Sequence, residues 1–138
     1  MAEFSTPIID FDKLPREIID RIKPLLLLDE IVQLCIYDNQ GARSYTYLVT
    51  NQKIIEIKTL FDSKAKIHYF EELHTYFLHD IFQVHELTHH IASDRVDYHD
   101  IEIRFGGEGF YTIRLDPKTA KRFEEVLINL LSKLKQHN

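Results

Sequence analysis

The residues most suggestive of chemistry lie between Ile81 and Ile91, where His85, Glu86 and His89 form the pattern His-Glu-x-x-His. On an α-helix, side chains four residues apart are about 5–6 Å apart at Cβ, so both imidazoles could bind one zinc ion at about 2.0–2.1 Å. Glu86 would then act as the catalytic general base. The pattern therefore supports one enzymatic hypothesis, a small zinc-dependent hydrolase of the metallopeptidase type.

The same spacing has a different consequence in a β-strand. Each strand residue advances about 3.3 Å, so His85 and His89 would lie roughly 13 Å apart and could not share one ion. Over Glu71–Ile91 the apolar periodicity favours a helix, whereas the abundance of aromatic residues, Thr and Ile favours a strand. We expect a strand over Ile81–Ile91, and with it no catalytic residue, no metal and no other cofactor. Zinc held by His85 and His89, with Glu86 catalytic, is the alternative.

A zinc site would also need a third ligand, and no second motif selects one. The candidates are Asp94, Asp97, His99, Asp100 and Glu102. Two further roles for the histidines stay open. His85, His89 and His90 could bind metal without catalysis, or all eight histidines could charge on mild acidification and move the net charge from −5 toward +3.

The composition limits the class of protein. A chain of 138 residues with 44% hydrophobic content is typical of one globular domain spanning 1–138. The excess of 22 acidic over 17 basic residues argues against a nucleic-acid partner. No apolar run approaches the roughly 20 residues of a transmembrane helix, and no signal peptide is visible at the N-terminus. The single cysteine, Cys35, permits no internal disulfide, and we expect a cytoplasmic protein.

The N-terminal part of the chain is expected to be helical after a loose lead-in over residues 1–11. Within the helical segment 12–28, a helix from about Leu14 to Lys23 would be capped by Asp12 and ended by Pro24. Ile18, Ile19 and Ile22 form its apolar stripe, which we expect to pack on the core.

The rest of the chain predicts about seven strands followed by one long helix. The strands are expected at Ile31–Tyr37, Arg43–Val49, Lys53–Thr59, Lys66–Phe70, Ile81–Ile91, Ile101–Phe105 and Phe110–Leu115. Turn residues over Phe61–Lys64 and a polar link over Ala92–Asp100 would separate some of them. Asp116 and Pro117 are typical of a helix start, and the apolar stripe that follows predicts a helix over 117–136 that covers the sheet.

This order of elements resembles the bacterial pleckstrin-homology-like (PH-like) domain family. The residues that carry the likeness are Leu27–Ile31, Tyr47–Ile55, His79–Val84, Ile101–Phe105 and the terminal helix. The resemblance implies a mainly β fold with α, a bent antiparallel β-sandwich or barrel of about seven strands capped by the C-terminal helix. It also implies a non-enzymatic scaffold that binds lipid headgroups, peptides or copies of itself.

Candidate ligand contacts are few on such a scaffold. Arg43 is the only basic residue at the first hairpin, which disfavours inositol-phosphate binding. A modest basic patch could form from Arg43, Lys53, Lys58, Lys64 and Lys66, although we expect the lysines to lie on a solvated strand face instead. Because open sheet edges invite strand addition and self-association, we expect a protein partner, a homo-oligomer or a lipid surface, in that order.

Overall fold

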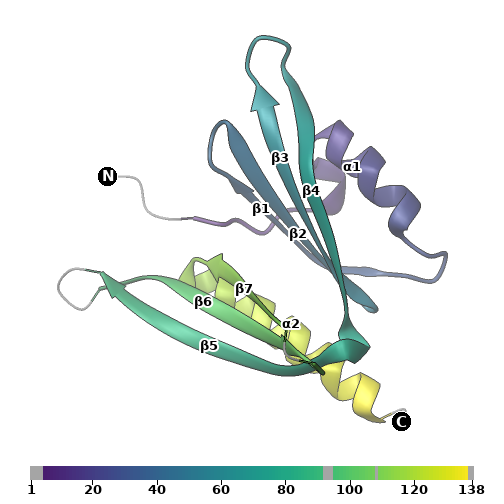
Figure 1. The fold of residues 1–138 in the computed structure, drawn as a ribbon, viewed down its shortest axis with the longest axis vertical. Coiled ribbons are helices and arrows are strands. Elements are labelled where there is room, and N and C mark those ends of the chain that lie inside the picture. The colour runs from purple at the N-terminus through teal and green to yellow at the C-terminus, as the bar shows by residue number, and fades with distance from the viewer. Residues whose placement is uncertain (1–4, 92–94, 108, 137–138) are drawn as a thin grey trace. The chain divides into compact units, whose positions relative to one another are not determined.

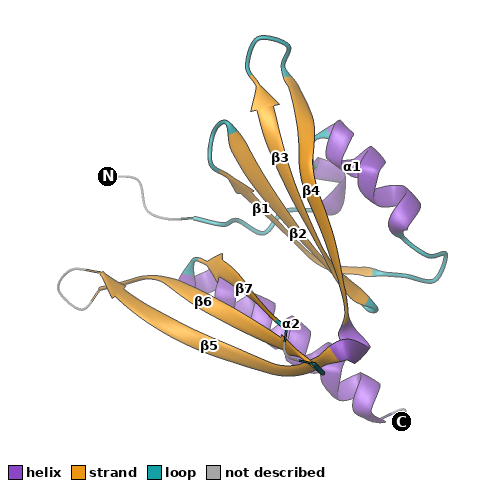
Figure 2. Cartoon of the chain, in the orientation of Figure 1, coloured by secondary structure: helices purple, strands orange, loops and turns teal. Residues whose placement is uncertain are grey.

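The computed structural model describes residues 5–91, 95–107 and 109–136, and the chain divides into two compact units (Figure 1, Figure 2). One unit runs from Pro7 to Phe77. The other comprises the chain from Leu78 onward together with the segment that ends at Thr6. Each unit contains one antiparallel sheet and at least one helix, so each is described by itself.

The first unit is a four-stranded meander with a small helical region before it. Its strands are β1 (Val32–Asn39), β2 (Arg43–Thr50), β3 (Lys53–Asp62) and β4 (Ile67–Phe77), in the order β1-β2-β3-β4. The helical region comprises η1 (Phe11–Lys13), α1 (Arg16–Ile22) and η2 (Lys23–Leu25). Figure 1 shows α1 beside this sheet.

The core of the first unit joins α1 to one face of the sheet. Ile18, Ile19 and Ile22 are buried because helical spacing gathers them on one stripe. They pack with the side chains of Leu14, Cys35, Leu48, Ile55 and Ile57. Burial raises the pKa of the Cys35 thiol to about 12, so this cysteine is a small core residue without thiolate character.

The second unit is a three-stranded sheet with the long helix packed on it. Its elements are η3 (Leu78–Asp80), β5 (Ile81–Ile91), β6 (Arg95–Phe105), β7 (Phe110–Leu115) and α2 (Pro117–Gln136), and the strand order is β5-β6-β7. Helix α2 packs against β6 and β7 (Figure 1). The buried side chains of this unit include Ile101, Ile103, Ile113, Leu115, Ala120, Phe123 and Leu127.

The main features expected from the sequence are confirmed. Across the residues that the structure describes, the fold is mainly β, with seven antiparallel strands, a short N-terminal helix and a C-terminal helix over 117–136. Ile81–Ile91 is a strand, paired along its length with β6. Asp116 caps the N-terminus of α2, because its Oδ1 accepts a hydrogen bond of 2.8 Å from the backbone N–H of Thr119. The expectation of a single domain over 1–138 stays a prediction.

Five local expectations were wrong. The lead-in is tied to β1, since the N–H of Ile9 donates to the carbonyl of Cys35 at 3.0 Å. Helix α1 follows Pro15 and receives no side-chain cap from Asp12. Strand β3 continues through Asp62, and β4 runs to Phe77, well past the expected end at Phe70.

The fifth error concerns the segment before Ile101. A polar link was expected over Ala92–Asp100, but β6 begins at Arg95. Polar residues extend this strand because their backbones pair with β5, with Thr88 opposite His99 and His89 opposite Tyr98. Residues 92–94 lie outside the described part of the chain.

Candidate functional site

The residues of the His-Glu-x-x-His pattern lie on β5. His85 pairs with Glu102 and Glu86 pairs with the buried Ile101, so the two side chains lie on opposite faces of the sheet. The backbone of His89 also belongs to β5, four strand residues and roughly 13 Å from His85, while its side chain lies outside the described residues. The helical geometry that a zinc hydrolase requires is therefore not formed here.

The proposed third ligands have other partners. The guanidinium of Arg114 donates to Asp100 at 2.9 and 3.3 Å and lies 4.0 Å from the ring centre of Tyr98. Arg104 donates to Glu102 at 2.6 Å. Asp94 and the side chain of Asp97 fall outside the description. Among the side chains that are described, no group of three or more His, Cys, Asp or Glu is arranged to hold a metal ion.

Glu86 instead joins three elements of the second unit. The imidazole Nδ1 of His99, on β6, lies against its Oε1. Glu86 also shares a hydrogen bond with Glu124 on α2. Burial, followed by this bond and the charge of Glu86, raises the pKa of Glu124 to about 7. The arrangement links β5 and β6 to the helix, a structural role that the sequence pattern did not indicate.

The five basic residues proposed as a patch are distributed over three places. Arg43 and Lys58 lie 3.4 and 3.5 Å from opposite oxygens of the Glu71 carboxylate, which offsets their charge. Lys64 and Lys66 are exposed in the turn between β3 and β4. Lys53 is buried and faces the interior of the first unit.

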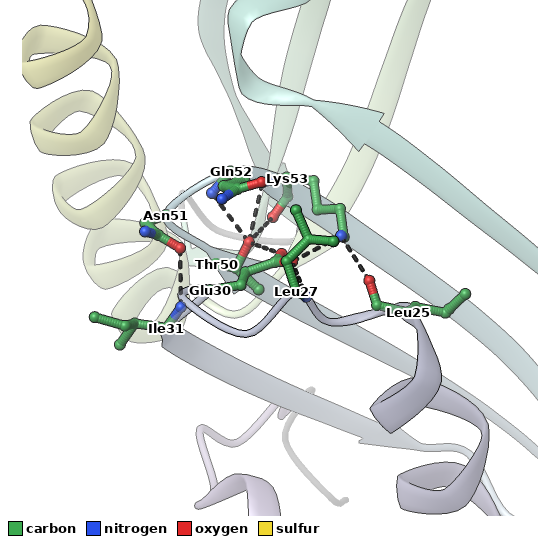
Figure 3. Close-up of polar contacts among 8 residues, drawn as sticks. All are labelled: Leu25, Leu27, Glu30, Ile31, Thr50, Asn51, Gln52 and Lys53. Carbon is green, nitrogen blue, oxygen red and sulfur yellow. Dashed lines mark hydrogen bonds and ion pairs between the residues drawn. The ribbon is translucent and has the colours of Figure 1, made fainter.

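Lys53 belongs to a buried polar network at the β2–β3 turn (Figure 3). Its Nζ donates to Oε1 of Glu30 at 2.8 Å and to the carbonyl of Leu25 at 2.7 Å. The hydroxyl of Thr50 donates to the other oxygen of Glu30 and accepts from the backbone N–H of Lys53. Burial alone would raise the pKa of Glu30, but the bonds from Lys53 and Thr50 hold it below its usual value.

The network also fixes the start of β1. The N–H of Leu27 donates to Glu30 at 3.0 Å, and the N–H of Ile31 donates to the side chain of Asn51 at 2.9 Å (Figure 3). Two stretches quoted for the PH-like resemblance, Leu27–Ile31 and Tyr47–Ile55, therefore meet here. The polar residues of these two stretches have a structural explanation, because they hydrogen-bond to one another and to the backbone around the β2–β3 turn.

A groove of about 500 Å³ lies between the start of β5 and the C-terminal half of α2. It is entirely within the second unit. The β side contributes Leu78, His79, Ile81, Phe82, Gln83 and Val84, and the helix contributes Ile128, Leu131, Ser132, Leu134 and Lys135. The walls are thus mostly apolar, with a few polar groups among them, as is common in binding sites.

Phe82 projects at this groove because of a β-bulge. Ile81 pairs with Phe105 and Gln83 pairs with Arg104, so Phe82 is the extra residue on β5. Its side chain is 75% exposed, and Ile128 on the helix is 54% exposed. Exposed apolar side chains of this size, gathered on one groove, are typical of an interaction surface.

Sequence reasoning missed the groove. The apolar stripe of the helix was expected to cover the sheet, but two of its residues, Leu131 and Leu134, line the groove. The stripe consists of Ala120, Phe123, Leu127, Leu130, Leu131 and Leu134. Ile128, which lies outside that stripe, was a usable signal, because an apolar residue there widens the apolar face of the helix beyond what the core needs. The bulge at Phe82 had no comparable signal in the sequence.

Comparison of the chain with protein-family models, curated proteins and solved structures yields no match. The PH-like resemblance therefore stays a prediction from sequence patterns. Across the described residues, neither helix combines the length and the apolar character needed to cross a membrane.

Proposed function

We propose that this chain is a non-enzymatic binding or assembly module of PH-like architecture, which acts in the cytoplasm and engages a protein partner. The observation that carries the proposal is the groove between β5 and α2. Its apolar walls and the exposed side chains of Phe82 and Ile128 would be covered by an apolar segment of the partner.

The positions of the residues that could have been catalytic support a binding role over a catalytic one. His85 and Glu86 point to opposite faces of β5, and Cys35 is buried in the core. The five basic residues do not converge on one surface, which weakens the case for a lipid headgroup as the main ligand.

Site-specific photo-crosslinking in cell extract tests the proposal. A benzoylphenylalanine placed at Phe82 should form adducts with a protein, visible as species heavier than the 16.4 kDa chain. The matched control is the same replacement at Phe110, an exposed phenylalanine of the same unit that does not line the groove. Equal adduct patterns at the two positions, or lipid adducts alone, would contradict binding of a protein in the groove.

A further inference from the structure

The position of β5 at the edge of its sheet is the starting point of this inference. In the described sheet, β5 is an edge strand that pairs only with β6. Antiparallel pairing directs alternate backbone N–H and C=O groups of β5 to β6 and leaves the others facing outward. Such an edge binds extended peptides through main-chain hydrogen bonds.

The bulge sets where the added strand would begin. Phe82 interrupts the regular pairing, so regular backbone geometry is available from Gln83 to His89. The β side of the groove lies between Leu78 and Val84, at the bulged end of β5. The end of the added segment nearest the bulge therefore lies over the groove beside Phe82, where its side chains alternate between the groove and the opposite side.

The groove's walls define the side chains it would take. Ile81, Val84, Leu131 and Leu134 provide apolar surface, so the occupant's groove-facing side chains are apolar. The ionisable residues of the lining are Lys135 and His79, and no lining residue is acidic. His79 lies 3.4 Å from the carboxylate of Asp80, so Lys135 is the lining residue that complements a carboxylate on the occupant.

We infer that the groove binds an extended segment of another protein, added as a strand beside β5, with apolar side chains at alternate positions and an acidic side chain that reaches Lys135. This inference rests on the proposed function and names the class of partner at the same groove.

The probe is a library of random twelve-residue peptides displayed on phage and panned against the immobilised full-length chain. Selected peptides should show apolar residues at alternate positions with a neighbouring Asp or Glu. Phe82→Asp should lower the affinity of the chain for the best synthetic peptide at least about thirtyfold, which is the effect expected of a central contact residue. Phe110→Asp should change its affinity less than about twofold, as for a residue outside an interface. Unfolding midpoints of both variants show whether each one folds.

Two finer variants test the chemistry of the segment. Lys135→Glu should lower the affinity for an aspartate-containing peptide about fivefold, in line with the loss of an exposed ion pair. Lys133→Glu lies outside the groove lining and should change the affinity little. N-methylation of alternate peptide residues should abolish binding in one register and spare it in the other, because only one set of N–H groups faces β5.

The outcomes separate this inference from the proposed function. If no peptide is enriched, or if Phe82→Asp leaves binding intact, both are overturned. If Phe82→Asp removes binding but the peptides repeat at steps of three and four, or tolerate N-methylation throughout, the groove function stands and strand addition is wrong. Selection of basic peptides would overturn the assignment of Lys135. Doubling of the purified chain's mass, reversed by Phe82→Asp, would identify a second copy as the occupant and overturn the inference.

Discussion

The ammonium group of Lys53 lies inside the first unit, although a lysine in a strand usually extends into water. Its side chain is 7% exposed, and the Glu30 side chain that it contacts is fully buried. A buried charge pair adds little net stability, but breaking it leaves one charge without a partner in a low dielectric. The sequence placed Lys53 among candidate ligand contacts because nothing in its neighbours indicated Glu30 as a partner.

Replacement of Lys53 should therefore be costly. We expect Lys53→Met to lower the free energy of unfolding by about 3–5 kcal/mol, since the Glu30 carboxylate is left buried without its cation. Urea denaturation measures the change. The double variant Glu30→Gln, Lys53→Met should recover part of the loss. Lys64→Met, in the exposed turn, should stay within about 0.5 kcal/mol of the parent protein. A loss below about 1 kcal/mol for Lys53→Met would show that the pair is not buried in solution.

The contact between Glu86 and Glu124 predicts a pH dependence. The folded-state pKa of Glu124 is about 7, above the value of about 4.3 for an unperturbed glutamate, because the carboxyl is partly buried and bonds to a second carboxylate, that of Glu86. The folded state therefore favours the protonated form. The contribution of protonated Glu124 to the free energy of unfolding is fully present below pH 4 and is lost as the pH rises through 7. Glu124→Gln should flatten the decline between pH 5 and 8.

Carbon-13 NMR of the Glu124 carboxyl gives the direct measurement, with a midpoint expected near pH 7. Glu86 on β5 bonds to Glu124, and His99 on β6 lies against Glu86, so a variant of Glu86 identifies the cause. Glu86→Gln should return the midpoint toward its ordinary value, and Glu125→Gln, on an exposed part of α2, should not. A midpoint near pH 4.5 in the parent protein would refute the pairing.

At the scale of elements, the start of α2 shows how a terminal segment stabilises a helix. Asp116 accepts from Thr119 through Oδ1, and its Oδ2 accepts from the backbone N–H of Thr6 at 2.8 Å. Burial would raise the pKa of Asp116, but hydrogen bonds from Thr119 and Thr6 hold it below its usual value. The cap was predictable from Asp-Pro, whereas the bond to a residue 110 positions away was not.

We expect Asp116→Ala to destabilise the fold by about 1–2 kcal/mol, because the first turn of α2 and the Thr6 N–H lose their acceptor. Asp116→Asn should cost less, since its amide oxygen can still cap the helix. The contribution of the charged form is present above about pH 4 and is lost as the pH falls through the lowered pKa. Chemical denaturation at pH 7 and pH 3 compares the three proteins. A difference between Asp116→Ala and the parent that grows toward pH 3 would contradict this assignment.

At the scale of the whole molecule, elements were predictable where periodicity and composition agreed. The helix over 117–136 and the strand over Phe110–Leu115 match the expected limits, because caps, turns and apolar patterns all indicate the same boundaries. Between Glu71 and Ile91 the two signals conflict. The recurrence of apolar residues at steps of three and four arises there in two strands separated by η3, so the step count does not reflect one helical face.

Because the chain contains eight histidines, its zinc content is best measured on the whole protein. Because β5 holds His85 and His89 roughly 13 Å apart, we expect the untagged protein to purify without stoichiometric zinc. Elemental analysis after dialysis measures the content, and a chelator should leave the unfolding midpoint unchanged. His68→Ala, in the other unit, is the control for weak surface binding. One zinc per chain, lost in both His85→Ala and His89→Ala but kept in His68→Ala, would require β5 to refold around the metal and would restore the hydrolase hypothesis.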